Sequence, residues 1–222
     1  MAETFTLFHL SRPPAATATA PPLLLLLHGV GSHEADLMGL APYLDPRFHI
    51  ISARAPNALA PGAYAWFHVE FTPTGPVIDP AEAEASRVSL LRFIDELVQG
   101  YGLDPSRVYL LGFSQGAIMS LSLALTEPKK LAGVVAMSGR IIPEVLPHMA
   151  PPEAMAGVPI LLIHGVADPV LGIEYGRAAR DRLSALPVAL RYREYPMGHQ
   201  VTEESLRDVA AWLRDRLDGK EL

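Results

Sequence analysis

Gly112-Phe113-Ser114-Gln115-Gly116 separates two apolar stretches, residues 108–111 and 117–125, which have the character of a buried strand and a helix. A G-x-S-x-G pentapeptide between a strand and a helix is typical of a nucleophile elbow. The serine at such a turn adopts strained backbone angles, so the residues two positions away on either side must be small. The motif therefore predicts a serine hydroxyl lifted clear of a sheet, beside the free N–H groups of a helix N-terminus.

Apolar runs and amphipathic segments alternate on both sides of this motif. We expect strands at 4–10, 23–27, 48–52, 107–111, 131–137, 158–163 and 189–195, and helices at 34–44, 81–99, 117–125, 173–186 and 203–217. Strands that are continuously apolar, each followed by a helix, predict a mostly parallel central sheet with helices on both faces. A chain of 222 residues fits a single α/β domain, 1–222, without a separate cap domain.

Three further polar segments follow predicted strands. His28-Gly29-Val30-Gly31 comes after 23–27, Asp168 closes the segment after 158–163, and His199 follows 189–195. Parallel sheets bind ligands at the carboxyl ends of their strands, so these segments and Ser114 are expected at one edge. The chain order serine, acid, histidine is the one expected with an elbow.

These residue types together suit acyl transfer. Ser114 would be the nucleophile and His199 the base that takes its proton, since a free imidazole has a pKa near 6.5. Asp168 would fix the imidazole tautomer and stabilise the imidazolium. The N–H groups of Gln115 and Val30 would form the oxyanion hole.

The chain resembles the phospholipase/carboxylesterase family of α/β-hydrolases, which includes acyl-protein thioesterases and small bacterial carboxylesterases. The resemblance rests on L-L-L-L-H-G-V-G at 24–31, G-F-S-Q-G at 112–116, H-G-V-A-D at 164–168 and M-G-H at 197–199. It implies the same catalytic and oxyanion residues and a homodimer. No metal or organic cofactor is expected. The lack of a long insertion between 131–139 and Val158 predicts an open, shallow site for small or flexible acyl substrates. Where the family commonly has Pro-Val-Val-Pro after the acid, this chain has Pro-Val-Leu-Gly at 169–172.

The sequence leaves the substrate open. A carboxylesterase for small or flexible esters is the first hypothesis, and an acyl-thioesterase or lysophospholipase would use the same machinery. A non-catalytic binding protein on the same fold is a remote alternative, which the complete Ser-His-Asp set opposes. An elbow serine also argues against dehalogenase or epoxide hydrolase chemistry, in which the nucleophile is an aspartate.

Two long segments are candidates for the substrate-binding walls. Residues 57–80 are rich in Pro, Gly and aromatic residues, show little helix or strand pattern, and include Trp66 and Phe67, which either line the pocket or belong to the core. Residues 141–157 carry several prolines and could form an apolar wall. Arg140, just before them, either meets a substrate carboxylate or pairs with an acid.

Other polar residues have simpler interpretations. Asp168 could instead cap a helix. Asp181 and Asp208 are poorer candidates for the acid that pairs with the histidine, because they fall inside predicted helices. His28 and His164 are expected to bond loop backbone rather than act as bases. His28 and His33 lack the helical spacing of a metal site.

Composition narrows the function classes. The net charge of −6 and the lack of a basic cluster argue against nucleic-acid binding, and the absence of cysteine excludes disulfides and thiolate chemistry. Residues 1–10 lack the features of a signal peptide. Residues 22–27 are apolar but far shorter than the roughly 20 residues that span a bilayer. A cytoplasmic protein without stable membrane insertion is expected.

Overall fold

The computed structural model describes residues 5–16, 19–73 and 75–220. Its main sheet has the strand order β1-β3-β2-β8-β9-β10-β11, and β1 alone runs antiparallel to its neighbour within the described residues. The strands are β1 (His9–Arg12), β2 (Leu23–Leu27), β3 (His49–Ala53), β8 (Val108–Phe113), β9 (Gly133–Met137), β10 (Pro159–Gly165) and β11 (Ala189–Tyr195).

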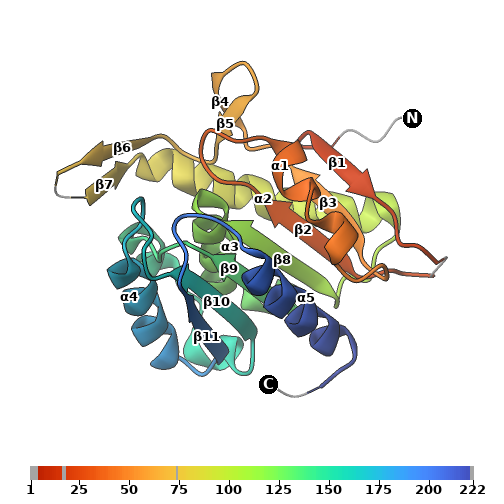
Figure 1. The fold of residues 1–222 in the computed structure, drawn as a ribbon. Helices are drawn as coiled ribbons and strands as arrows, with labels where there is room; N and C mark the ends of the chain where they lie inside the picture. The colour runs from red at the N-terminus through yellow and green to blue at the C-terminus, as the bar shows by residue number, and fades with distance from the viewer. Residues whose placement is uncertain (1–4, 17–18, 74, 221–222) are drawn as a thin grey trace.

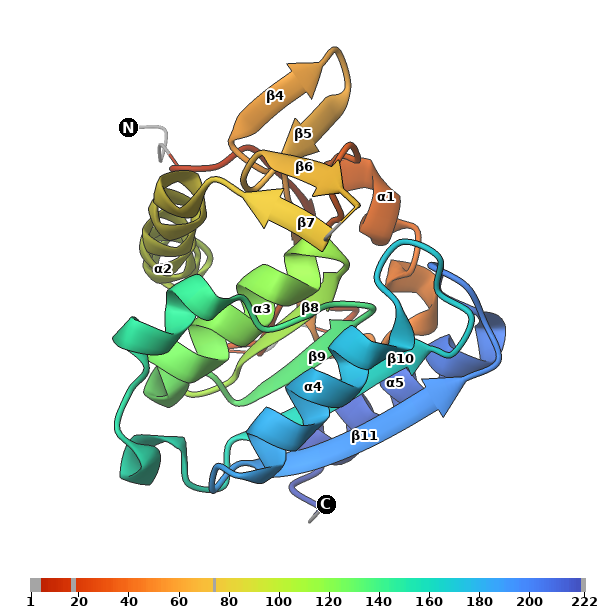
Figure 2. The ribbon, with the colours of Figure 1, turned by 90° about the vertical axis from the view of Figure 1, so that its left-hand side faces the viewer.

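Helices cover both faces of this sheet (Figures 1 and 2). On one face lie α1 (Glu34–Met38) and α5 (Glu203–Leu217), and on the other lie α2 (Pro80–Tyr101), α3 (Gln115–Thr126) and α4 (Ile173–Ser184). Short 3-10 helices occupy Ala41–Tyr43, Pro128–Lys130, Pro143–His148 and Pro152–Met155. The mostly parallel sheet between two helical layers agrees with the predicted architecture.

The five leucines of β2 show why its sequence is continuously apolar. Leu23, Leu25 and Leu27 pack into the core cluster under α2 and α3, whereas Leu24 and Leu26 pack into the cluster under α1 and α5. All five are fully buried. A strand in the middle of a doubly covered sheet has no solvent face, so no polar alternation appears in its sequence.

Helix boundaries follow local chemistry. Asp79 accepts hydrogen bonds from the N–H groups of Ala81 and Glu82, Pro80 takes the first position of α2, and Gly102 ends the helix in the left-handed conformation at φ 61°. The predicted helix at 34–44 is shorter than expected: α1 ends at Met38 and a 3-10 turn follows, because Pro42 cannot donate a backbone hydrogen bond.

Two predictions about irregular segments were wrong. The first strand lies at His9–Arg12, where it pairs with β3, rather than at 4–10, of which residue 4 lies outside the described residues. Residues 57–80 form two hairpins, β4 (Asn57–Ala60) with β5 (Ala63–Ala65) and β6 (Val69–Thr72) with β7 (Gly75–Ile78). In Figure 2 the β6–β7 hairpin lies beyond one end of α3, on the side of the turn between β8 and α3.

Candidate active site

The turn between β8 and α3 has the strained geometry that its sequence predicts. Ser114 adopts φ 54° and ψ −118°, and residues other than glycine rarely adopt such a positive φ. A Cβ on Gly112 would lie 2.3 Å from the carbonyl oxygen of Gly116, and a Cβ on Gly116 would lie 1.9 Å from the carbonyl oxygen of Leu27. Both flanking positions therefore require glycine.

Asp168 and His199 meet at the ends of neighbouring parallel strands. Asp168 follows β10 and His199 follows β11, and Asp168 Oδ2 lies 2.7 Å from His199 Nδ1. The Asp168 side chain is fully buried, and its Oδ1 accepts hydrogen bonds of 2.9 Å from the N–H groups of Val170 and Leu171. Three hydrogen bonds thus fix this carboxylate.

The surroundings of Asp168 decide its charge and the tautomer of His199. Burial alone would raise the pKa of Asp168, but the hydrogen bonds from His199, Leu171 and Val170 together outweigh burial and lower this pKa below its ordinary value. An ionised carboxylate only accepts hydrogen bonds, so Nδ1 of His199 is the donor. The other ring nitrogen, Nε2, is then free to accept a proton.

The loop that carries His199 packs against the turn that carries Ser114. Phe113, directly before Ser114, has its ring centroid 4.9 Å from that of His199. β8 and β10 also lie on either side of β9, so the ends of these strands share one edge of the sheet. The structure thereby brings the predicted serine, acid and histidine segments to the same region.

Two backbone N–H groups flank Ser114. Gln115 is the first residue of α3, where N–H groups have no acceptor within the helix. Val30 lies in the loop after β2, and its N–H donates to no backbone carbonyl among the described residues. Gly29, just before Val30, would place a Cβ 3.2 Å from the Cβ of Ser114, so this loop faces the serine directly.

The side chain of Gln115 has a role that the sequence did not reveal. Its Oε1 accepts a 2.7 Å hydrogen bond from the N–H of Trp66, and its Nε2 donates a 2.6 Å bond to the carbonyl oxygen of Phe67. Trp66 is fully buried and donates from Nε1 to the carbonyl oxygen of His28. Of the two alternatives left open for these aromatic residues, Trp66 is therefore a core residue that supports the site, whereas Phe67 lines the cleft beside Ser114.

The other two strand-end histidines bond backbone groups, as expected. His28 has Nδ1 2.8 Å from the carbonyl oxygen of Gly29, and its Nε2 accepts from the N–H of Ala55 at 3.1 Å. Burial lowers the pKa of His28, which keeps the ring neutral. His164 is fully buried with Nε2 2.7 Å from the carbonyl oxygen of Leu171. Both rings support loops of the site.

A small apolar cleft opens at Ser114. Its volume of about 30 Å³ holds no more than a few water-sized groups. The hairpin β6–β7 and the loop after Asp168 supply walls that were not predicted individually. The lining residues are Val30, Phe67, Val69, Pro76, Ile78, Ser114, Gln115, Ile118, Arg140, Val170 and Leu171.

The described residues offer neither a metal site nor a membrane-spanning helix. Across residues 5–16, 19–73 and 75–220, no group of three or more His, Asp or Glu side chains is arranged to hold a metal ion. Near the elbow, His33 instead accepts from the N–H of Ala35, and Asp36 accepts from the hydroxyl of Ser32. No helix in the same described ranges has the length and apolar character needed to cross a membrane.

Comparison with known proteins places this site in a family. Residues 14–217 match the model of the family described as Phospholipase/Carboxylesterase. The chain belongs to the phospholipase/carboxylesterase family. Its sheet and helices are those of an α/β-hydrolase.

Named relatives agree with that membership. Acyl-protein thioesterase 1 of Gibberella zeae is 35% identical over 54% of this chain and 52% of its own length. Carboxylesterase SOBER1 of Arabidopsis thaliana is 29% identical over 70% of this chain and 69% of its own. The crystal structure of esterase PE8 superposes with a TM-score of 0.80 and 29% identity, covering 94% of this chain and 98% of that one. This family member is a hydrolase.

Proposed function

We propose that this family member is a serine carboxylesterase that hydrolyses small or flexible carboxylic esters through an acyl-enzyme. Ser114 attacks the ester carbonyl while Nε2 of His199 takes its proton. Asp168 keeps the imidazole oriented and stabilises the imidazolium that forms. His199 then protonates the leaving alcohol, and a water molecule repeats the sequence to release the acid.

The oxyanion of each tetrahedral intermediate would lie between the N–H groups of Val30 and Gln115. These donors are held by the backbone rather than by mobile side chains, so they need no reorganisation during the reaction. Removing one such donor typically costs roughly 3 kcal/mol of transition-state stabilisation. Phe67 and Arg140 would contact the substrate, because both line the cleft at Ser114.

The observation that carries this proposal is the pairing of His199 with a buried, ionised Asp168 beside a strained Ser114. The acid–base distance is 2.7 Å and the serine has φ 54°. The strained serine is unfavourable in an ordinary loop, since a positive φ at a serine costs of order 1–3 kcal/mol. A non-catalytic binding protein would have no use for both.

A thioesterase or lysophospholipase with the same machinery is the second candidate. The acyl-protein thioesterase among the relatives favours it. We further propose that residues 1–222 act as one domain in the cytoplasm, without metal or organic cofactor. A homodimer is the assembly to test, by light scattering.

Steady-state kinetics on three substrate types separates the candidates. We would compare p-nitrophenyl esters of rising chain length with an acyl-thioester and a lysophospholipid, using wild type and Ser114→Ala. The carboxylesterase proposal predicts the highest kcat/KM on short esters and loss of turnover in Ser114→Ala. A higher kcat/KM on the thioester or the lysophospholipid would replace it with the second candidate. Ester turnover that persists in a folded Ser114→Ala protein would reject the mechanism.

A further inference from the structure

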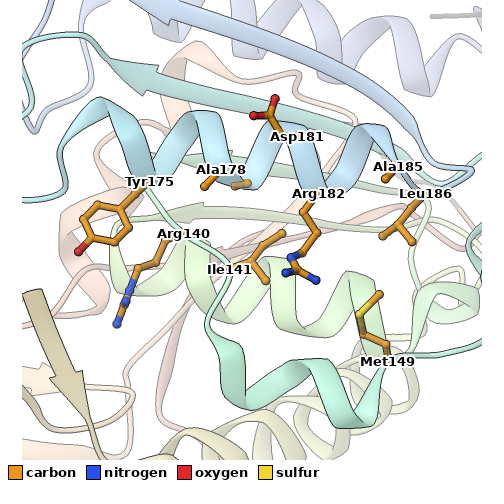
Figure 3. Close-up of a pocket in the computed structure, with 10 residues that line it drawn as sticks. Arg140, Ile141, Met149, Tyr175, Ala178, Asp181, Arg182, Ala185 and Leu186 are labelled. Carbon is orange, nitrogen blue, oxygen red and sulfur yellow. The ribbon is translucent and has the colours of Figure 1, made fainter.

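Arg140 lies at the junction of two cavities. It follows β9 and lines both the small cleft at Ser114 and a groove of about 610 Å³ beneath α4. Figure 3 shows its side chain beside Tyr175, at one end of that groove. A guanidinium in this position is within reach of a substrate whose ester carbonyl sits at Ser114.

The guanidinium has few partners of its own. Its Nη2 donates to the carbonyl oxygen of Pro76 at 3.3 Å, and its central carbon lies 5.5 Å from the centroid of the Tyr175 ring. Its Nε is buried without a hydrogen-bond partner. No carboxylate oxygen of the described residues lies within 4.0 Å, although Glu144 acts on it at longer range.

Arg12 and Arg216 also have a buried Nε without a hydrogen-bond partner, but neither lines the cleft at Ser114. Some other arginines are paired with carboxylates. Arg54 donates two hydrogen bonds, of 2.7 and 2.6 Å, to Glu34, and Arg177 donates two, both of 2.9 Å, to Glu194. A half-buried guanidinium with an unpaired Nε is costly unless an acceptor satisfies it, and a carboxylate would also balance its charge. Burial also lowers the pKa of Arg140, which is the opposite of the effect of a paired carboxylate.

We infer that Arg140 binds a carboxylate carried by the substrate, so that the preferred substrates are short esters bearing a second, ionised carboxyl group. This inference rests on the proposed function and specifies its substrate class. The guanidinium fork suits a carboxylate, which accepts two parallel N–H bonds. The narrow apolar cleft between Ser114 and Arg140 requires a short spacer between the ester and the anion.

Two matched substrate pairs test the inference. Monoethyl glutarate and its amide isostere, ethyl glutaramate, place the charge on the acyl side, and 4-acetoxybutanoate and 4-acetoxybutanamide place it on the alcohol side. We expect wild type to prefer the charged member of at least one pair by roughly 10- to 100-fold in kcat/KM, the effect of one charge-assisted hydrogen bond. A pH-stat measures all four reactions.

Three variants connect the preference to the residue. Arg140→Gln should bring the ratio of kcat/KM for the charged substrate to kcat/KM for its neutral isostere close to one. Arg140→Lys should retain part of the preference for the charged substrate. Arg182→Gln is the matched control, because Arg182 lines the same groove but not the cleft at Ser114, and its ratio should equal that of wild type. A ratio near one in wild type for both pairs, or a full ratio in folded Arg140→Gln, would overturn the inference.

Binding keeps this test separate from the test of catalysis. Isothermal titration calorimetry of Ser114→Ala with each substrate pair measures the charge preference without turnover. Preferred binding of one charged member, together with no turnover in wild type, would support the anion site and reject the esterase proposal. Equal binding of both members in each pair would overturn the anion site whatever the kinetics show.

Discussion

Gly116→Ala tests whether the elbow needs its close contact with β2. The new Cβ would lie 1.9 Å from the carbonyl oxygen of Leu27 and 2.8 Å from that of His28, both of them backbone atoms. Ordinary contact begins near 3.4 Å, so the start of α3 and the end of β2 must separate by about 1.5 Å. Because Ser114 precedes α3 and Val30 follows β2, the separation would widen the space between the Ser114 hydroxyl and the N–H of Val30, its proposed oxyanion donor.

Overpacking a rigid site costs typically 1–3 kcal/mol of folding free energy, and a misplacement of about 1 Å can cost roughly 100-fold in rate. We therefore expect Gly116→Ala to lose roughly 2 kcal/mol or more in urea unfolding and roughly 100-fold in kcat/KM on a short ester. Gly62→Ala is the control: Gly62 has φ +77° but nothing within 4 Å of its Cβ position, so it should lose stability and keep activity. Wild-type stability and activity in Gly116→Ala would refute the close contact.

Three further variants test neighbouring parts of the account. Asp168→Asn should lower kcat by roughly 10⁴-fold, because an amide does not hold His199 in the required tautomer; ester kinetics measure this. Glu34→Gln should be less stable than wild type at neutral pH, because the hydrogen bonds from Arg54 lower the pKa of Glu34 to about 2. The difference in free energy of unfolding between the two proteins should shrink as the pH falls from about 4.5 towards 2 and Glu34 becomes protonated. Urea unfolding across that range measures it. Gln115→Ala leaves the N–H of Trp66 and the carbonyl oxygen of Phe67 without their partner. Its free energy of unfolding in urea should fall by roughly 1–3 kcal/mol for each of these groups.

Each of these variants has a matched control. Asp181→Asn changes an exposed aspartate of α4 and should leave kcat unchanged; equal losses in Asp168→Asn and Asp181→Asn would contradict the assignment of the acid. In an Arg54→Gln background, Glu34→Gln should cause little further loss in the free energy of unfolding. A loss as large as in wild type would show that the two side chains are not coupled. Gln99→Ala removes an exposed amide, so it should stay near wild-type stability.

The sheet and most helices could be predicted from the sequence because their buried positions are occupied by apolar residues. β2 has the predicted bounds, and α5 spans 203–217 as predicted, since one face of each turn is apolar and Thr202 caps its start. β1 was misplaced because an edge strand is defined by its pairing with β3 more than by its own residues. The two hairpins within 57–80 were missed because each strand has only three or four residues, too few to show a period.

The candidate site was predictable where chemistry is concentrated in motifs, as at Ser114, Asp168 and His199. Contacts between distant segments were not. Nothing in the local sequence of Gln115 shows that its side chain bonds the backbone of residues 66–67, or that Trp66 turns into the core. Such contacts depend on tertiary packing. β7, Gly75–Ile78, shows no alternation of apolar and polar residues, so no local pattern could have placed the β6–β7 hairpin beside the cleft.

Covalent labelling would identify the nucleophile by its position in the chain. Wild type would be treated with a fluorophosphonate, digested and analysed by mass spectrometry, with Ser114→Ala as the control. We expect one adduct per chain, on the peptide that contains Ser114, and no adduct in a folded Ser114→Ala protein. An adduct on another serine, or an unlabelled but folded wild type, would contradict the assignment of Ser114 as the nucleophile.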